Sequence, residues 1–338
     1  MQRRAAEACV NLRPHAKTHK APQIGRMQLA AGARGVTLAK VSEAEVFVRE
    51  GFDDIFLGYP IFGADKARRL LALTDRARVV VGADSEEGAR SLGAVFHAAG
   101  RRLPVRLKID CGYHRVGVPP ERALETARRI AALPGIAFDG LFTHGGQGYG
   151  GETPEEVARI GREEGRIVSE TAETLRAGGL PVAEVSLGST PTVASAVTQP
   201  GVTECRPGTY VYNDFSQVSL GSCGFEDCAL TVLATVVSVP APDRAVLDAG
   251  SKTLSADPLR PHAGGHGLVV GRRSRLARLS EEHGVVQVEP GESFRIGERV
   301  RVLPNHACVV SNLHDRLIGV RAGRVEGEID VAARGCVQ

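Results

Sequence analysis

The stretch Arg13-Pro14-His15-Ala16-Lys17-Thr18-His19-Lys20 sets the interpretation of the whole chain. It places Lys17 at the end of a strand-like segment, residues 12–17, in a chain whose basic residues are mostly arginines. A crowded lysine loses its proton more easily, and a neutral amine can form a Schiff base. A lysine at a strand end is more often a solvated charge, so a chemical role for Lys17 depends on the rest of the sequence.

Strand-like and helix-like segments alternate regularly through the first two-thirds of the chain. The eight strand-like segments are residues 12–17, 35–40, 54–59, 78–82, 104–110, 138–144, 184–188 and 204–210. The helix-like segments are residues 23–33, 42–50, 64–74, 85–99, 120–132, 154–177 and a shorter one after Pro191. Eight βα units of this spacing predict a (β/α)8 barrel of roughly 200–250 residues. A doubly wound sheet is the alternative, but no Gly-x-Gly-x-x-Gly motif follows the first strand.

The pattern changes near Cys228. Later strand-like segments are separated by glycine and proline, and helical periodicity is nearly absent. These segments are residues 231–239, 244–248, 267–270, 284–288, 298–303 and 316–320, and the glycine-rich residues 261–267 are typical of a loop. We therefore predict two domains, an α/β barrel over residues 1–227 and a β-rich domain over residues 228–338.

The composition excludes several classes of protein. A net charge of +3 and an aromatic content of 4 %, without tryptophan, argue against a nucleic-acid-binding surface. No run of eighteen apolar residues is present, and the N-terminus lacks the apolar region of a signal peptide, so we expect no membrane span and no secretion. The seven cysteines are widely spaced, unlike a disulfide framework, and we predict a cytoplasmic protein.

In a (β/α)8 barrel the active-site residues lie at the C-terminal ends of the strands. Chemically active side chains follow several of the predicted strands: Lys17, Lys40, Asp110, Cys111, His114, Arg115, His144, Gln147 and Tyr149. The last two strands run into Gly188-Ser189-Thr190-Pro191-Thr192 and Arg206-Pro207-Gly208-Thr209-Tyr210. The first of these loops precedes a helix begun by proline and exposes backbone N–H groups, which bind anions well. Phosphate sites in barrels are often built from these two loops, so we predict one here.

The second chemical signal is Pro304-Asn305-His306-Ala307-Cys308. On an extended strand, His306 and Cys308 would share one face and offer an imidazole and a thiolate to one metal ion. Either residue could be structural, because a lone His-x-Cys pair seldom binds metal. Together with a Schiff-base lysine, the pair suggests pyridoxal phosphate chemistry with a Lewis acid beside it.

In combination, these motifs resemble those of the D-serine dehydratase and D-threonine aldolase group of fold-type III pyridoxal phosphate enzymes, relatives of alanine racemase. The resemblance covers nearly the whole chain. Beyond the motifs above, it includes Asp110-Cys111-Gly112-Tyr113-His114-Arg115-Val116-Gly117 and Asp248-Ala249-Gly250-Ser251-Lys252. It implies an alanine racemase-like barrel with Lys17 as the Schiff-base residue, and a β-rich domain carrying the metal ligands. The other implied residues are Arg115 near the pyridine ring, His144, Tyr149, Thr190, Gly208 and Thr209 around the cofactor, and His306 and Cys308 on the metal.

The resemblance also implies a reaction. Members resembling D-serine dehydratase carry His-x-Cys with zinc, whereas members resembling D-threonine aldolase carry His-x-Asp with a harder ion, Mn²⁺ or Mg²⁺. Cys308 therefore predicts a zinc-dependent D-serine dehydratase that eliminates the β-hydroxyl of a D-amino acid, giving an α-keto acid and ammonia. The alternatives are a metal-dependent D-threonine aldolase that releases glycine and an aldehyde, a non-catalytic pyridoxal phosphate carrier, and a metal-dependent hydrolase. A homodimer, with the β domain of one subunit over the barrel mouth of the other, is also implied.

The chain departs from the family pattern at its start. Family members usually begin with an extra segment whose strand joins the β-rich domain, whereas this chain opens within the first helix, at Met1. The missing strand predicts an exposed sheet edge in the β-rich domain. None of the residues assigned to the site is affected.

Overall fold

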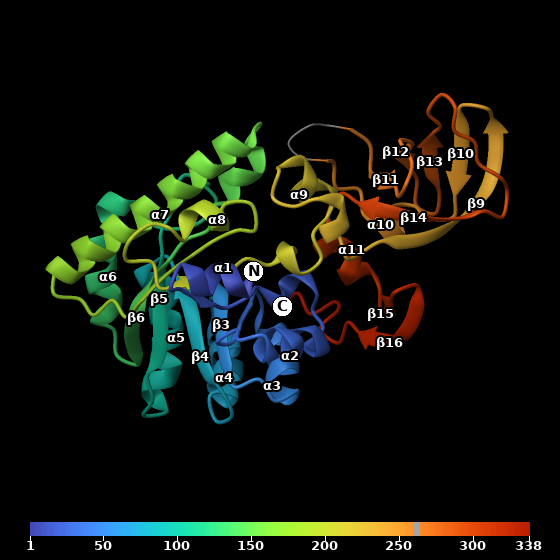
Figure 1. Ribbon diagram of the computed structural model, residues 1–338. Coiled ribbons are helices and arrows are strands. Elements are labelled where there is room, and N and C mark those ends of the chain that lie inside the picture. The colour runs from blue at the N-terminus through green and yellow to red at the C-terminus, as the bar shows by residue number, and fades with distance from the viewer. Residues whose placement is uncertain (260–263) are drawn as a thin grey trace.

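Eight parallel strands form the N-terminal sheet, and helices lie around it (Figure 1). The computed structural model describes residues 1–259 and 264–338. The strands follow the order β1-β8-β7-β6-β5-β4-β3-β2, as the predicted (β/α)8 fold requires. They are β1 (Asn11–Leu12), β2 (Val36–Leu38), β3 (Asp54–Pro60), β4 (Arg78–Ala83), β5 (Leu103–Lys108), β6 (Ile136–Phe142), β7 (Glu184–Leu187) and β8 (Glu204–Cys205).

Helices follow the strands in the predicted alternation. They are α1 (Gln2–Glu7), α2 (Pro22–Ala30), α3 (Val41–Arg49), α4 (Ala64–Leu73), α5 (Glu86–Ala98), α6 (Pro120–Ala131), α7 (Pro154–Ala177), α8 (Val193–Ala196) and α9 (Phe215–Ser219). Helix α5 illustrates why they form: the Ser85 hydroxyl accepts the Gly88 N–H at 3.1 Å and caps its first turn. Leu92 and Phe96 then recur at i, i+4 and are buried against the sheet.

The first strand is much shorter than the predicted segment 12–17. Beyond β1 the chain meets β2 through a parallel bridge between His15 and Thr37, with the Thr37 N–H donating to the Pro14 carbonyl at 2.8 Å. Proline has no N–H of its own to extend a ladder. The chain turns instead into the 3₁₀ helix η1 (Ala16–Thr18). Lys17 therefore lies in a turn after the strand, which corrects the prediction of a strand-end lysine.

Strand β8 is also shorter than the predicted 204–210. It stops at Cys205, one residue before Arg206 and Pro207, and the chain then forms η3 (Thr209–Val211). The two shortened strands are neighbours, with Leu12 paired to Cys205. Their early ends leave room above the barrel for the turns that carry Lys17 and Thr209.

Charged side chains fill the interior of the barrel. Glu204, fully buried, accepts hydrogen bonds from Arg13 Nε at 2.6 Å and Arg106 Nη1 at 2.7 Å. Arg13 also binds Asp54 with both Nη atoms, each at 2.9 Å, and Arg106 binds Asp139 at 2.7 Å. Burial would raise the pKa of Glu204, but the two arginines outweigh it and lower that pKa to about 2.

The C-terminal domain contains a six-stranded closed barrel in the order β10-β13-β12-β11-β14-β9 (Figure 1). Its strands are β9 (Val232–Ala241), β10 (Arg244–Leu247), β11 (Gly267–Val269), β12 (Arg275–Leu279), β13 (Gly284–Gln287) and β14 (Arg299–Pro304). This sheet closes on itself, so the exposed edge predicted for the β-rich domain does not lie in it, whereas the two-stranded sheet of β15 (Arg316–Arg321) and β16 (Arg324–Asp330) does leave edges open. The first residues of the predicted glycine-rich loop, up to Ala263, lie outside the described residues.

Several short elements of this domain escape the sequence pattern. They are strand β12, the helices α10 (Ser251–Leu254) and α11 (Ala307–Leu313), and the second strand of the hairpin β15 (Arg316–Arg321) and β16 (Arg324–Asp330). In β16 nearly every residue is exposed, so its sequence has no alternation of apolar and polar residues to reveal it.

After β16 the chain returns to the α/β barrel. Ala333 is fully buried in the core of that barrel, and its N–H donates to the Lys20 carbonyl at 3.0 Å. Lys20 in turn forms a buried ion pair with Glu43, at 2.6 Å. The domain boundary at residues 227 and 228 stays a prediction. Over the described part of the chain, every helix is too short or too polar to cross a membrane.

Candidate active site

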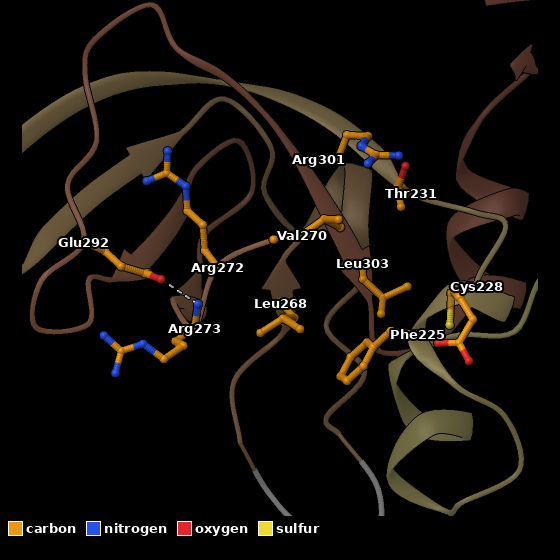
Figure 2. Close-up of a pocket in the computed structure, with 12 residues that line it drawn as sticks. Phe225, Cys228, Thr231, Leu268, Val270, Arg272, Arg273, Glu292, Arg301 and Leu303 are labelled. Atoms are coloured by element: carbon orange, nitrogen blue, oxygen red, sulfur yellow. Dashed lines mark hydrogen bonds between the residues drawn. The ribbon is translucent and has the colours of Figure 1, made fainter. Parts of the chain in front are cut away.

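A cavity of about 410 Å³ lies between the mouth of the α/β barrel and the β-rich domain. Each residue that the sequence assigned to the cofactor or the metal lines it: Lys17, Arg115, His144, Tyr149, Thr190, Gly208, Thr209, His306 and Cys308. A larger hollow of about 700 Å³ lies on the β-rich domain and contains none of these residues (Figure 2). Chemistry rather than size therefore identifies the smaller cavity as the candidate active site.

Lys17 stands in the wall of this cavity. Its side chain is reached by solvent through the cavity, but protein surrounds the amine closely enough for desolvation to matter. This burial lowers the pKa of Lys17, and Arg115 adds to the effect, although Cys308 opposes it. A lysine with a lowered pKa is the one that can act as nucleophile and base.

Lys108, at the end of β5, is a second buried lysine near the mouth. Its Nζ lies 4.7 Å from the centroid of the Phe142 ring. Burial, with help from Arg206, lowers its pKa to about 7. Lys108 does not line the cavity, whereas Lys17 does.

His144 follows β6 and approaches the cavity with a defined tautomer. Its Nδ1–H donates to the Gly188 carbonyl at 3.0 Å, which leaves Nε2 as an acceptor. Burial, then the charges of Lys108 and Lys17, hold its pKa well below the usual range, so the imidazole is neutral. The ring meets Tyr113 edge to face at 5.8 Å.

Tyr149 and Arg115 line the cavity together with His144. Tyr149 lies in η2 (Gly146–Gly150), and burial raises its pKa above the usual range, so it remains a neutral hydrogen-bond donor. Arg115 lies over the ring of Tyr113, with 4.7 Å between its guanidinium carbon and the ring centroid. The cavity thus receives a permanent cation and a neutral phenol.

The two predicted phosphate loops meet at one end of the cavity. The Thr190 hydroxyl accepts the Tyr210 N–H at 3.1 Å and so ties the loop after β7 to the loop after β8. Gly208 is required by close approach, because an added Cβ would lie 2.7 Å from Thr18 Oγ1. The helix after Pro191 is only the four-residue α8, so the cluster of loops, rather than a long helix, shapes this end.

A buried glutamate holds the first loop from below. Glu164 on α7 accepts the N–H groups of Gly145 and Gly188 at 2.8 and 3.0 Å, and the Thr192 hydroxyl at 2.6 Å. Its position was not predicted, because residues in the middle of a long helix carry no loop signal.

His306 and Cys308 do not lie on an extended strand, as the sequence analysis expected. Strand β14 ends at Pro304, His306 caps the N-terminus of α11, and Cys308 is in the first turn. The Ala307 N–H donates to Asp214 Oδ2 at 3.0 Å, which bends the chain into the helix. The two side chains still lie close enough to shift each other's pKa.

This contact controls the protonation of both groups. Burial alone would raise the pKa of Cys308, but the hydrogen bond and charge of His306 outweigh it and lower that pKa. Burial would likewise lower the pKa of His306, but Cys308 and Asp257 raise it to about 9. Cys308 Sγ also lies 3.2 Å from Thr18 Oγ1, beside Lys17. A lowered pKa favours the thiolate, the form that binds metal.

Two acidic residues at the cavity were missed by the sequence analysis. Asp257 Oδ2 accepts His306 Nδ1–H at 2.6 Å. Asp214 caps α9 through Oδ1, and burial raises its pKa to about 6 despite the N–H of Ala307. The run Asn213-Asp214-Phe215-Ser216-Gln217 does carry a helix-cap signal, but an aspartate before Pro258 suggests only a turn.

Two family models match the chain. The first, "Alanine racemase, N-terminal domain", matches residues 1–215, and the second, "Putative serine dehydratase domain", matches residues 229–320. The chain belongs to the D-serine dehydratase and D-threonine aldolase family of alanine racemase-like enzymes. Its members share the fold-type III barrel of pyridoxal phosphate enzymes followed by the β-rich domain seen here.

Individual relatives match along nearly all of the chain. D-threonine aldolase of Arthrobacter sp is 36 % identical over 99 % of this chain and 88 % of its own length. D-serine dehydratase of Dictyostelium discoideum is 32 % identical over 92 % of this chain and 86 % of its own. The structure of D-threo-3-hydroxyaspartate dehydratase from Delftia sp. HT23 matches with a TM-score of 0.91 and 33 % identity, over 97 % of this chain and 92 % of that one. This member of the family is thus a pyridoxal phosphate-dependent lyase acting on D-amino acids.

Proposed function

We propose that the protein is a zinc-dependent D-serine dehydratase, which eliminates the β-hydroxyl of a D-amino acid to give an α-keto acid and ammonia. The observation that carries the proposal is that the imidazole of His306 and the thiol of Cys308 line the same cavity as Lys17. A thiolate favours zinc over the harder ions that suit carboxylate ligands.

The cavity suits pyridoxal phosphate. Lys17 supplies an amine of lowered pKa, and Thr190, Gly208 and Thr209 supply the small, hydroxyl-bearing end for a phosphate. Bound through Lys17, the cofactor would act as an electron sink for a carbanion at Cα. Arg115 has hydrogen-bond donors only, so a ring nitrogen beside it would stay unprotonated, and the sink would be weaker. Loss of hydroxide then depends more on assistance at the leaving group.

The donor set near His306 suits a catalytic metal ion rather than a structural one. Among the described residues, no group of three or more His, Cys, Asp and Glu side chains could hold a metal ion. Two protein ligands leave positions open for water and substrate, as a catalytic zinc needs. A bound zinc would withdraw charge from the departing hydroxyl.

The Delftia relative supports this assignment of ligands. Structures of that dehydratase include variants with alanine in place of a histidine, or of a cysteine two positions later. The cysteine variant is described as being in the metal-free form. The spacing is that of His306 and Cys308.

The residues of the chain divide the proton transfers between them. With its amine free, Lys17 would act as the general base that takes the Cα proton. Tyr149, a neutral phenol, can donate a hydrogen bond but not remove a proton. His144, neutral and with Nε2 unprotonated, can accept one.

The second candidate is retro-aldol cleavage of D-threonine, and the Arthrobacter relative favours it. The two reactions give different products. Purified protein should be yellow and release an α-keto acid and ammonia from D-serine in the presence of Zn²⁺. Release of glycine from D-threonine, dependent on Mn²⁺, would replace the dehydratase by the aldolase.

We also propose a homodimer in which the β-rich domain of each subunit covers the barrel mouth of the other. Phe62 and Tyr59, after and within β3, are 63 % and 46 % exposed. The hollow of Figure 2 offers a complementary surface, with Phe225, Leu268 and Leu303 inside it and Arg301 at its rim. Such apolar surfaces on a monomer mark interaction sites.

The unpaired state of all seven cysteines supports a cytoplasmic location.

A further inference from the structure

Asp257 is held in place by Ser255 and by Asn305, the residue directly before His306. Its N–H donates to the Ser255 hydroxyl at 3.0 Å, and its carbonyl accepts Asn305 Nδ2 at 3.0 Å. Asn305, immediately before His306, also donates to the Gly265 carbonyl at 2.9 Å. The Asp257 carboxylate then accepts His306 Nδ1–H at 2.6 Å, a short, charge-assisted distance.

We propose that Asp257 is a positioning residue that orients His306 for the metal ion, an inference that rests on the proposed metal site. An imidazole can bind a metal through either nitrogen, and the hydrogen bond made by the other nitrogen decides which one is used. Because Nδ1 is engaged by Asp257, Nε2 is the nitrogen left for the metal. A carboxylate partner of this kind also makes the ring a better ligand.

A purely structural role does not account for this pair. The side chains of His306 and Asp257 are 41 % and 45 % exposed. Ion pairs with this much solvent contribute little to stability. The contact between Asp257 and His306 therefore serves to orient the imidazole ring rather than to stabilise the fold.

The other ligand has matching support from the α/β barrel. Cys308 Sγ lies 3.2 Å from Thr18 Oγ1 and 3.6 Å from Thr209 Oγ1. These hydroxyls can donate to a thiolate and fix its position. Asp257 orients His306 from within the β-rich domain, and the two threonines likewise fix the position of Cys308 from the α/β barrel.

The experiment measures metal affinity rather than turnover. Holoenzyme carrying its pyridoxal phosphate is stripped of metal with a chelator and titrated with Zn²⁺ against a competing zinc indicator. We expect Asp257→Asn, whose amide oxygen can still accept from Nδ1–H, to weaken zinc binding about 10-fold, and Asp257→Ala about 100-fold. Asp243→Asn is the matched control, since it removes an exposed carboxylate from the same domain without touching the cavity.

A crystal structure of the zinc-loaded protein separates positioning from direct ligation. The proposal requires zinc on His306 Nε2 with the Asp257 contact to Nδ1 intact. Zinc bound directly to a carboxylate oxygen of Asp257, or equal zinc affinity in all variants, overturns it while leaving the metal site standing. Wild-type protein that binds no zinc at all would remove both the metal site and this role of Asp257. Unchanged thermal unfolding of the metal-free variants shows that any lost affinity is not lost folding.

Discussion

The interior of the α/β barrel and its mouth both contain charged side chains, but these are paired with carboxylates in the interior and, over the described residues, lack such partners at the mouth. In the interior, Glu204 binds Arg13 and Arg106, and each arginine binds a second carboxylate. At the mouth, Arg115 lies on an aromatic ring instead, and Lys17 opens into the cavity. The interior network lowers the pKa of a carboxyl, which stabilises the fold, whereas the mouth lowers the pKa of an amine, which costs stability. Charges without carboxylate partners thus mark the part of the barrel reserved for cofactor and substrate.

The largest effect should come from removing the charge at the mouth. Lys17→Ala should reduce kcat by at least ~100- to 10,000-fold, because the general base is lost along with the anchor of the cofactor. Borohydride reduction of the wild-type holoenzyme followed by mass spectrometry should find the cofactor on Lys17. The control is Lys252→Ala, which removes an exposed lysine paired with Glu281. A reduced adduct on Lys40 or Lys252 would disprove the assignment.

Metal removal should have the next largest effect and should leave the fold intact. A two-ligand site releases its ion more readily than a closed structural site, so a chelator should abolish D-serine elimination, by about 100-fold or more, while the yellow colour remains. Zn²⁺ should restore activity. Circular dichroism and product assays before and after chelation test this, and turnover that survives chelation would exclude the Lewis-acid role.

Replacing the thiolate ligand Cys308 by a carboxylate should show whether this residue selects the metal ion. Cys308→Asp replaces a thiolate by a carboxylate, so it should weaken zinc binding and shift the preference toward Mn²⁺. Metal titrations of the wild type and the variant measure this shift. A variant with unchanged preference would show that Cys308 does not select the ion.

Breaking the interior network should affect stability and spare catalysis. Glu204→Gln leaves two buried arginines without their shared carboxylate and should cost about 3–5 kcal/mol in the free energy of unfolding. The pKa of Glu204 is depressed to about 2, so its contribution is present above the unfolded pKa and is lost as pH falls from about 4.3 toward 2. Urea unfolding at pH 7 and at pH 3 should show a large difference between wild type and variant at pH 7 and a smaller one at pH 3. Equal differences at both pH values would contradict the linkage.

The smallest effect concerns assembly. Phe62→Asp places a charge on the exposed apolar surface at the mouth and should weaken the dimer by about 10-fold or more. Light scattering across a dilution series measures the dissociation constant. Val325→Asp, at a residue that is 70 % exposed in hairpin β15–β16, is the control. A fully active monomer would remove the dimer from the mechanism.

Much of the fold and the candidate site can be predicted from the sequence because both follow local rules. Alternating strand and helix patterns fix the barrel, and barrel topology brings residues after the strands to one mouth. Lys17, Arg115 and His144 could therefore be grouped although they are far apart in the chain. The predicted ends of β1 and β8 lie too late in the chain, although Pro14 and Pro207 lie just beyond the observed ends and cannot donate to a strand ladder.

Residue type by itself determined which chemistry is available to this protein: a lysine and an arginine at the barrel mouth, and an imidazole and a thiolate two residues apart. Only the tertiary structure decided how the last pair is presented. Asp214, 93 positions before Ala307, turns the chain into helix α11, and Asp257, 49 positions before His306, orients its ring. Hydrogen bonds between residues so distant in the chain depend on the packing of separate elements, and that packing has no signature in the sequence around either partner.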